Sequence, residues 1–275
     1  MIQDISPYML DNNFYPDLEP AKGDFIMHFC GKKVLACDDV KSPFPVFEDF
    51  TKEQRYIYLF TLAEKRYFLI LGNEAEIPDG YRYIEIKDVR HAKGSVKINV
   101  LAMFTAFHLF NWYRTSRYCG ACSAEMVQSE TERALCCKKC GNIVYPRINP
   151  AVIVGVTNGD KLLITRYAQG HGVEYDALIG GFVEIGETLE ETVHREVMEE
   201  TGLKVKNLRY YKSQPWGYSG GMLTGYFCDV DGNDTITIDE SELSSGIWVN
   251  KEDIVGQPDD LSLTSEMMMT FKNKK

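Results

Sequence analysis

The sequence has little positive charge for its length. Its 275 residues include 30 Lys and Arg against 40 Asp and Glu, which gives a formal net charge of −10. Non-specific binding to nucleic acid or to a membrane surface needs a basic face, so this balance argues against both classes. An anionic ligand would need local cations or metal ions.

Long apolar runs are also missing. No apolar segment of about 18 residues occurs, which argues against a transmembrane span. The first residues, MIQDISPYML, lack the basic start and apolar core of a signal peptide. We therefore expect a cytoplasmic protein with no membrane partner. In that reducing compartment the eight cysteines favour metal ligation over disulfides.

The chain has the pattern of an α+β protein with three parts. Strand-like segments and one aromatic-rich helix over 96–115 predict an N-terminal α+β domain, and the aromatic spacing of that helix is typical of a packed core face. The expected domains are an N-terminal α+β domain over 1–115, a cysteine-rich unit over 116–145 and a further domain over 146–275.

The last domain mixes short strands with helices. Its expected elements are a hairpin over 151–166, strands over 176–184, 205–211, 223–230, 235–238 and 247–249, and helices over 188–201 and 265–271. Gly202 is expected to end the first helix at its C′ position.

Two CxxC pairs lie within the cysteine-rich unit. Cys119 and Cys122 form one pair, and Cys137 and Cys140 form the other. Two such knuckles joined by a hairpin supply four thiolates in a tetrahedron, which suits a structural Zn²⁺. Cys136 leaves an ambiguity, although the CxxC spacing selects Cys137 as the ligand.

A zinc ribbon can also bind nucleic acid. The connector over 123–136 carries Glu125, Glu130 and Glu132 but only Arg133 as a base, which does not favour phosphate contacts. A nucleic-acid-binding protein nevertheless stays open as an alternative class.

The helix over 188–201 carries clustered acids. On a helical wheel, Glu196 and Glu200 continue the apolar stripe of Leu189 and Val193, whereas Glu199 lies at its flank. A solvated charged face with ion pairs four residues apart is the alternative, but it does not explain two acids on the inner face. Inward carboxylates must take up protons or bind a cation, and clustered oxygen ligands favour Mg²⁺ or Mn²⁺.

The residues around this helix read GFVEIGETLEETVHREVMEETGL, starting at Gly181. This segment resembles the Nudix hydrolase signature, GX5EX7REUXEEXGU with U aliphatic, at every specified position. The resemblance implies an α/β/α sandwich that hydrolyses nucleoside diphosphate derivatives with a divalent metal. It implies catalytic roles for five residues: Glu187, Arg195, Glu196, Glu199 and Glu200.

The same resemblance implies how these roles divide. Glu196 and Glu200 would bind the metal, with Glu199 as a further ligand or the catalytic base. Gly180 would offer its main-chain carbonyl to the metal, and Glu187 would pair with Arg195. Which glutamate is the base varies among Nudix hydrolases.

The order of N-terminal domain, zinc ribbon and Nudix signature is similar to that of the NADH pyrophosphatases, a family that also removes NAD caps from RNA. That family carries an SQPW array followed by PFPxS. In this chain SQPW is present at 213–216, but GYSGG stands at 217–221 in place of PFPxS. The resemblance implies substrate contacts from Gln214, Pro215, Trp216, Gly217, Tyr218, Ser219, Gly220 and Gly221. Loss of both prolines makes this loop more flexible and bears on substrate selectivity.

Three further matches follow from that family. Tyr145 in YPRINP, Phe182 and Trp216 are candidates for stacking on substrate rings, with core packing as the alternative for each. Glu242 matches a further metal-binding glutamate, with a solvated loop acid as the alternative.

The resemblance implies hydrolysis of NADH or NAD to nicotinamide mononucleotide and AMP, with NAD-capped RNA 5′ ends as a further substrate. It also implies a homodimer. The alternatives are a Nudix hydrolase that prefers ADP-ribose or dinucleoside polyphosphates, and a zinc-ribbon nucleic-acid binder with an inert Nudix fold.

Overall fold

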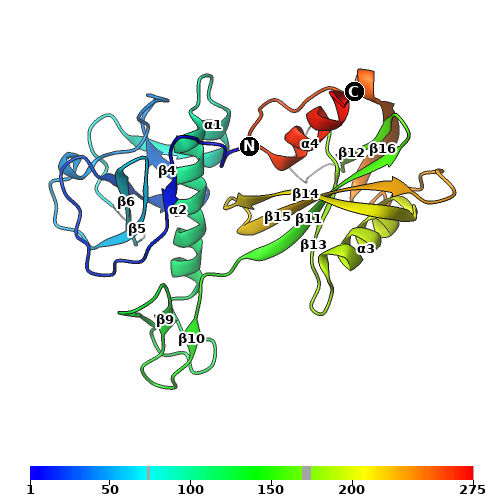
Figure 1. Ribbon diagram of the computed structural model, residues 1–275. Coiled ribbons are helices and arrows are strands. Elements are labelled where there is room, and N and C mark those ends of the chain that lie inside the picture. The colour runs from blue at the N-terminus through cyan, green and yellow to red at the C-terminus, as the bar shows by residue number, and fades with distance from the viewer. Residues whose placement is uncertain (73–74, 169–174, 275) are drawn as a thin grey trace. The chain divides into compact units, whose positions relative to one another are not determined.

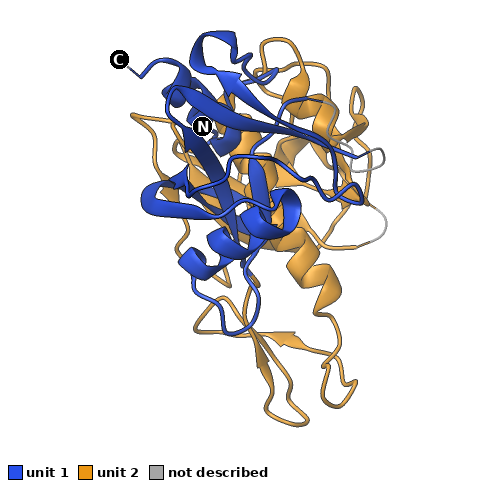
Figure 2. Ribbon diagram, turned by 90° about the vertical axis from the view of Figure 1, so that its right-hand side faces the viewer, with its two compact units in different colours: residues 1–2, 148–216, 221–275 blue, residues 3–147, 217–220 orange. Residues whose placement is uncertain are grey.

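The computed structural model describes residues 1–72, 75–168 and 175–274. The chain forms two units, coloured separately in Figure 2. Unit 1 contains residues 1–2, 148–216 and 221–275, and unit 2 contains residues 3–147 and 217–220. Both mix helices with strands, which confirms the α+β class. The three domain boundaries expected from the sequence stay predictions.

Unit 1 is built on one mixed sheet with the strand order β14-β15-β11-β12-β16, and β13 pairs with β11 off this path. Its strands are β11 (Asn149–Asn158), β12 (Lys161–Tyr167), β13 (Ile179–Phe182), β14 (Val205–Trp216), β15 (Gly221–Val230) and β16 (Leu243–Asn250). Its helices are α3 (Leu189–Thr201), the 3₁₀ turn η2 (Lys251–Asp253) and α4 (Leu263–Lys272).

Alternation along the strands places a helix on each face of this sheet. Leu163 of β12 packs in one core cluster with Val193 and Val197 of α3. Its neighbours Leu162 and Ile164 pack in a second cluster with Met267 and Met268 of α4. Successive residues of a strand point to opposite faces, so α3 and α4 cover opposite sides (Figure 1). This arrangement is the expected α/β/α sandwich.

Helix α3 has clear start and stop signals. The Thr188 hydroxyl accepts the N–H of Glu191, and the Glu191 carboxylate accepts the N–H of Thr188, which completes a capping box. Gly202 ends the helix with a φ of 69°, a left-handed conformation that favours glycine. The predicted helix and its predicted stop are both confirmed.

The strand predicted over 235–238 is wrong. Ile236 and Ile238 do pack against the α3 side of the core, which explains their alternation. The backbone of this segment, however, bonds to the end of α3: the N–H of Thr237 donates to the Thr201 carbonyl, and that of Asp239 donates to the Glu200 carbonyl. The segment therefore satisfies exposed helix carbonyls instead of pairing in the sheet.

Unit 2 contains three small sheets, with the strand orders β1-β5-β6-β2, β3-β4-β7 and β10-β9-β8. Its strands are β1 (Leu10–Asp11), β2 (Phe25–Met27), β3 (Phe29–Cys30), β4 (Lys33–Ala36), β5 (Tyr56–Leu62), β6 (Lys65–Ile70), β7 (Arg82–Glu85), β8 (Val127–Gln128), β9 (Leu135–Cys136) and β10 (Ile143–Val144). Its helices are the 3₁₀ turn η1 (Phe47–Asp49), α1 (Ile86–His91) and α2 (Lys97–Thr115).

The long helix α2 forms much of the core of unit 2. The ring centroids of Phe107 and Phe110 lie 5.3 and 5.2 Å from the ring centroid of Phe29. These contacts confirm that the aromatic residues of this helix form a packed core face. Among the described residues, no helix is both long and apolar enough to cross a membrane.

Candidate active site

Helix α3 directs its acids to different environments. Glu196 and Glu200 are 8% and 3% exposed, whereas the Glu199 side chain is 58% exposed. Val193 and Val197 on the same face are fully buried. The predicted orientation of the three glutamates is therefore confirmed, and two carboxylates lie against the sheet where burial of charge is costly.

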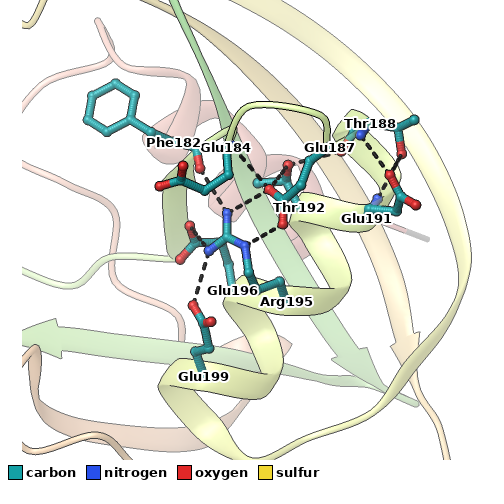
Figure 3. Close-up of polar contacts among 9 residues, drawn as sticks. All are labelled: Phe182, Glu184, Glu187, Thr188, Glu191, Thr192, Arg195, Glu196 and Glu199. Carbon is teal, nitrogen blue, oxygen red and sulfur yellow. Dashed lines mark hydrogen bonds and ion pairs between the residues drawn. The ribbon is translucent and has the colours of Figure 1, made fainter.

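Arg195 braces the loop before α3. Its guanidinium donates from Nε to Glu187 Oε1 at 2.6 Å and from Nη2 to Glu187 Oε2 at 2.9 Å, as Figure 3 shows. Nη2 also donates to the Phe182 carbonyl at 2.9 Å. The hydrogen bonds from Arg195 to Glu187 hold the pKa of that carboxyl well below its usual range, at about 2. The bidentate pair fixes the loop relative to the helix.

The same guanidinium reaches two acids of the cluster. Arg195 Nη1 donates to Glu196 Oε1 at 2.8 Å and to Glu199 Oε2 at 3.0 Å (Figure 3). Arg195 thus connects the loop acid Glu187 to both glutamates. The bond that Glu187 accepts from the Thr192 hydroxyl, at 3.0 Å, was not anticipated from the sequence. The only hint of this bond in the sequence is the short separation of five residues between Glu187 and Thr192.

Glu200 has the most unfavourable surroundings for a charge. Burial raises its pKa to about 8, and the carboxylates of Glu196 and Glu242 add to the rise. Its Oε2 is buried and has no hydrogen-bond partner among the described residues. Burial also raises the pKa of Glu196. An unpartnered acceptor beside further carboxylates is the environment that a bound cation would relieve.

Two glycines of β13 form the wall opposite these acids. A Cβ on Gly181 would lie 1.9 Å from the Glu196 carboxyl carbon, so only glycine leaves room for that carboxylate. The main-chain N–H of Gly180 forms a hydrogen bond with Glu200, which offsets part of the rise that burial causes in the pKa of Glu200. Gly181 opens the sequence signature, but its steric role became apparent only from this packing.

The carboxylates of the glutamate cluster lie near one another but do not converge on one point as the ligands of a bound metal do. Over 1–72, 75–168 and 175–274, only the four cysteines place three or more metal-ligating groups within 4.8 Å of one another. Glu196 and Glu199 are instead bonded to Arg195. Glu242 is exposed, and its charge acts on both Glu196 and Glu200. The oxygen-rich donor set and the unpartnered Glu200 oxygen fit a divalent cation that prefers oxygen ligands.

The cysteine cluster in unit 2 fits Zn²⁺ closely. Sγ of Cys119 lies 3.6 Å from that of Cys140, and Sγ of Cys122 lies 3.4 Å from that of Cys137. Zn–S bonds of about 2.3 Å in a tetrahedron require sulfur separations of about 3.8 Å. Cys136 lies outside the cluster, which agrees with the ligand selected by spacing.

The candidate ring-stacking residues differ in exposure. Phe182 is 52% and Tyr145 54% exposed, and the Tyr145 hydroxyl donates to Glu132 at 3.0 Å. Trp216 is half-buried at the end of β14. Their exposure excludes core packing for Phe182 and Tyr145, and ring stacking on a substrate stays a prediction for both.

The Gln214 side chain makes structural hydrogen bonds. It is fully buried, its Nε2 donates to the Leu261 carbonyl at 2.8 Å, and its Oε1 accepts the N–H of Leu263 at 2.7 Å. Both ends of the amide are thereby bonded to the main chain that leads into α4. The Gln214 side chain therefore holds that segment in place, and the substrate contact implied by the family resemblance stays a prediction.

The GYSGG turn after β14 is shaped by packing within unit 2. A Cβ on Gly217 would lie 2.1 Å from the Phe104 carbonyl oxygen, so this position excludes the proline of the family array. The Tyr218 ring lies 5.8 Å from that of Phe104 and 6.2 Å from that of Phe107, with Lys32 Nζ 5.5 Å from its centroid. Tyr218 is anchored by these contacts.

Four more residues of this segment were expected to contact substrate. Pro215 and Ser219 are exposed, and Gly220 adopts a φ of 70°, which favours glycine. Gly221 is buried at the start of β15. These four residues stay candidates for substrate contacts.

Comparison with known proteins gives two domain matches. Residues 147–269 match the NUDIX domain, and residues 114–145 match the NADH pyrophosphatase zinc ribbon domain. The crystal structure of a NUDIX hydrolase from Nitrosomonas europaea shares the fold, with a TM-score of 0.50 and 18% identity, over 57% of this chain and 92% of that one.

Curated relatives match over the same region. The chain is 40% identical over 172 residues to proteins named NAD-capped RNA hydrolase NudC from Shigella boydii serotype 18 and from Escherichia coli strain K12 / DH10B. Each match covers 60% of this chain and 66% of the relative, so the chain spans slightly less than two thirds of their length.

Proposed function

Since the chain belongs to the Nudix hydrolases that carry an NADH pyrophosphatase zinc ribbon, we propose that it hydrolyses the diphosphate of NADH or NAD to nicotinamide mononucleotide and AMP. The curated relatives are named for NAD-capped RNA, which supports capped RNA 5′ ends as a further substrate. In both substrates the bond that breaks is the same phosphoric anhydride.

The observation that carries this proposal is the buried pair of Glu196 and Glu200, with one Glu200 oxygen left without a partner among the described residues. Glu196, Glu200, Glu199 and Glu242, together with the Gly180 carbonyl, would hold Mg²⁺ or Mn²⁺. Such an ion, when bound, neutralises the diphosphate and polarises the phosphorus under attack. A protein that only binds nucleic acid has no use for this buried pair, which argues against an inert Nudix fold.

The other groups of the cluster have two roles: some hold the loop and helix in place, and one accepts a proton. Glu187 and Arg195 hold the loop against α3, and the Glu196 carboxylate packs directly on Gly181. A glutamate of the cluster takes the proton of the attacking water, and Glu199 is suited to this by its exposure. Single Gln variants of the three glutamates identify the base by the loss of kcat.

As the family resemblance implies, Phe182, Tyr145 and Trp216 are each proposed as ring-stacking residues, and Pro215, Ser219, Gly220 and Gly221 are proposed as further substrate contacts. The anchored Tyr218 and the close approach of Gly217 to Phe104 support a shaping role for these two residues. Zn²⁺ on the four cysteines is proposed to be structural, because no ligand position is left open for water. The homodimer and the cytoplasmic location stay predictions.

A substrate panel tests the proposal. Zinc-loaded protein with Mg²⁺ or Mn²⁺ is incubated with NADH, NAD, ADP-ribose, a dinucleoside polyphosphate and an NAD-capped RNA, and the products are separated by chromatography. We expect AMP and reduced nicotinamide mononucleotide from NADH, with a higher kcat/KM for NADH than for ADP-ribose. Preference for ADP-ribose would reassign the substrate, and no hydrolysis of any of the five would refute the proposal.

A further inference from the structure

The segment before β16 is bonded to the end of α3. The N–H of Thr237 donates to the Thr201 carbonyl at 2.9 Å, and the N–H of Asp239 donates to the Glu200 carbonyl at 3.0 Å. The last carbonyls of a helix have no donor within the helix, so these bonds satisfy groups that would otherwise need water. The second bond ends at the residue that carries the buried, unpartnered carboxylate oxygen.

Asp239 bonds through its main chain to two of the proposed metal-binding glutamates. Its N–H donates to the Glu200 carbonyl at 3.0 Å, and its own carbonyl accepts the N–H of Glu242 at 3.1 Å. The same carbonyl accepts the N–H of Leu243 at 2.9 Å, where β16 begins. One residue therefore joins the backbone of Glu200 to that of Glu242.

The Asp239 carboxylate closes the turn that leads to Glu242. Its Oδ1 accepts the N–H of Ser241 at 2.9 Å and the Ser241 hydroxyl at 2.6 Å. The bonds from Ser241 hold the pKa of Asp239 below its usual range, so the group is an ionised acceptor. A bond from an aspartate to the main chain two residues on fixes the local backbone. Glu242 follows directly, so this turn sets where its side chain begins.

The other side of Glu242 is held by the sheet. The Glu242 carbonyl accepts the N–H of Ala168 at 2.9 Å, directly after the end of β12. The pairing of β12 with β16 shifts register at this point, between Arg166 and Tyr167. The main chain of Glu242 is thus bonded to the sheet through Ala168 and to α3 through Asp239.

This double attachment matters because the Glu242 side chain is exposed. Its charge nevertheless acts on both Glu196 and Glu200, so the carboxylate lies near the buried pair. An exposed side chain on an unrestrained loop samples many conformations, and ordering it costs entropy when it binds a ligand. A fixed backbone at Glu242 reduces that cost.

Helix capping alone does not account for the contacts of Asp239. Its N–H bond to α3 needs only a main chain, which any residue except proline supplies. The bonds from Ser241 to the Asp239 carboxylate do not involve the helix. A direct role for Asp239 as a metal ligand is the other alternative, and two donors already bond to its Oδ1.

From these contacts we propose that Asp239 is a positioning residue of the acidic site, which holds Glu242 close enough to Glu200 for both carboxylates to join in binding a divalent cation. This inference rests on the function proposed above and adds a residue outside the glutamate cluster. Groups that orient metal ligands from behind usually change metal affinity or activity about 10–100-fold when they are removed.

Calorimetric titration of the zinc-loaded full chain with Mn²⁺, without nucleotide, tests the proposal alongside kcat on NADH. Asp239→Ala removes the acceptor of the turn, whereas Asp239→Asn keeps an oxygen in that place and removes the charge. Glu240→Ala is the matched control, since it removes an exposed acid of the same turn. Thermal melts establish that each variant is folded.

We expect Asp239→Ala to weaken Mn²⁺ binding about tenfold or more and to lower kcat by a similar factor. Asp239→Asn is expected to recover most of both losses, because its side-chain oxygen can accept the bonds from Ser241. Glu240→Ala should match the wild type. If Asp239→Ala fails to fold, Ser241→Ala takes its place, and the missing hydroxyl bond is expected to weaken Mn²⁺ binding several-fold.

A double-variant cycle separates positioning from a general loss of stability. In a Glu242→Gln background, Asp239→Ala is expected to change neither Mn²⁺ affinity nor kcat further, because both changes act through the same carboxylate. A residue that only stabilised the fold would instead lower the melting temperature in both backgrounds and leave Mn²⁺ affinity unchanged.

Three results would overturn the positioning role while the proposed function stands. They are wild-type Mn²⁺ affinity in the folded variant that removes the acceptor or the hydroxyl bond, equal losses in Asp239→Asn and Asp239→Ala, and a full further loss in the Glu242→Gln background. Wild-type protein that binds Mn²⁺ but hydrolyses no dinucleotide refutes the proposed function alone, and the Mn²⁺ affinities then decide on Asp239. Wild-type protein that binds no Mn²⁺ refutes both.

Discussion

Replacing Gly181 by alanine is the sharpest steric test of the acidic site. The added Cβ would lie 1.9 Å from the Glu196 carboxyl carbon, whereas carbon atoms in contact are usually about 3.5 Å apart, so the carboxylate must retreat by about 1.6 Å. Gly181 has no left-handed φ, so alanine is compatible with the backbone itself. The perturbation therefore acts on the position of Glu196.

A displacement of that size has a predictable effect on catalysis. Misplacement of a catalytic group by about 1 Å lowers turnover about 10²-fold, so we expect kcat on NADH to fall by at least that factor in Gly181→Ala. Overpacking costs about 1–3 kcal/mol of folding stability, which shifts the melting temperature without unfolding the protein. Steady-state kinetics and thermal melts measure both quantities.

The matched control and the double variant make this test specific. Gly120→Ala also adds a Cβ, but nothing lies within 4 Å of it, so wild-type kcat is expected. Adding Gly181→Ala to Glu196→Gln is expected to reduce kcat little further, because both changes disable the same carboxylate. Wild-type turnover by Gly181→Ala, or full additivity in the double variant, would refute this reasoning.

Three more predictions concern the parts around the site. Cys137→Ser is expected to lower both the zinc content and the melting temperature, whereas Cys136→Ser keeps one zinc per chain; metal analysis and melts decide this, and equal loss in both would contradict the ligand assignment. Gln214→Ala leaves buried main-chain groups without partners, so a loss of about 1–3 kcal/mol in denaturant unfolding is expected with an unchanged KM for NADH. A raised KM without lost stability would instead make Gln214 a substrate contact. The pKa of Glu187 is about 2 in the folded chain, below its ordinary value of 4.5, so its stabilising bond to Arg195 is fully present above about pH 4.5 and is lost as the pH falls toward 2. Denaturant unfolding of wild type and Glu187→Gln should therefore differ most at pH 6 and by less at pH 3, with the difference vanishing only below about pH 2. A constant difference between pH 6 and pH 2 would argue against this ion pair.

Local patterns predicted helix α3 and its acids in detail. The capping threonine, the glycine at the end and the helical wheel each depend on neighbouring residues only, so the sequence alone placed Glu196 and Glu200 on the inner face. The zinc cluster was predictable for the same reason, because CxxC spacing sets the geometry of each knuckle.

Features that depend on distant parts of the chain could not be predicted in this way. The isoleucines of 235–238 alternate as in a strand, but their backbone bonds to the end of α3. Gln214 matched a family position, yet its amide bonds to main chain far along the sequence. The contact of Gly181 with Glu196 crosses from β13 to α3.

The turnover of NADH by Glu200→Gln tests the central claim most directly. The variant keeps the shape of Glu200 but removes the charge that would bind the metal, and Glu252→Gln makes the same change at an exposed position of unit 1. We expect Glu200→Gln to lower kcat by orders of magnitude with Mg²⁺ or Mn²⁺ while its melting temperature is maintained or rises, and Glu252→Gln to match the wild type. Wild-type turnover of NADH by folded Glu200→Gln would contradict the account.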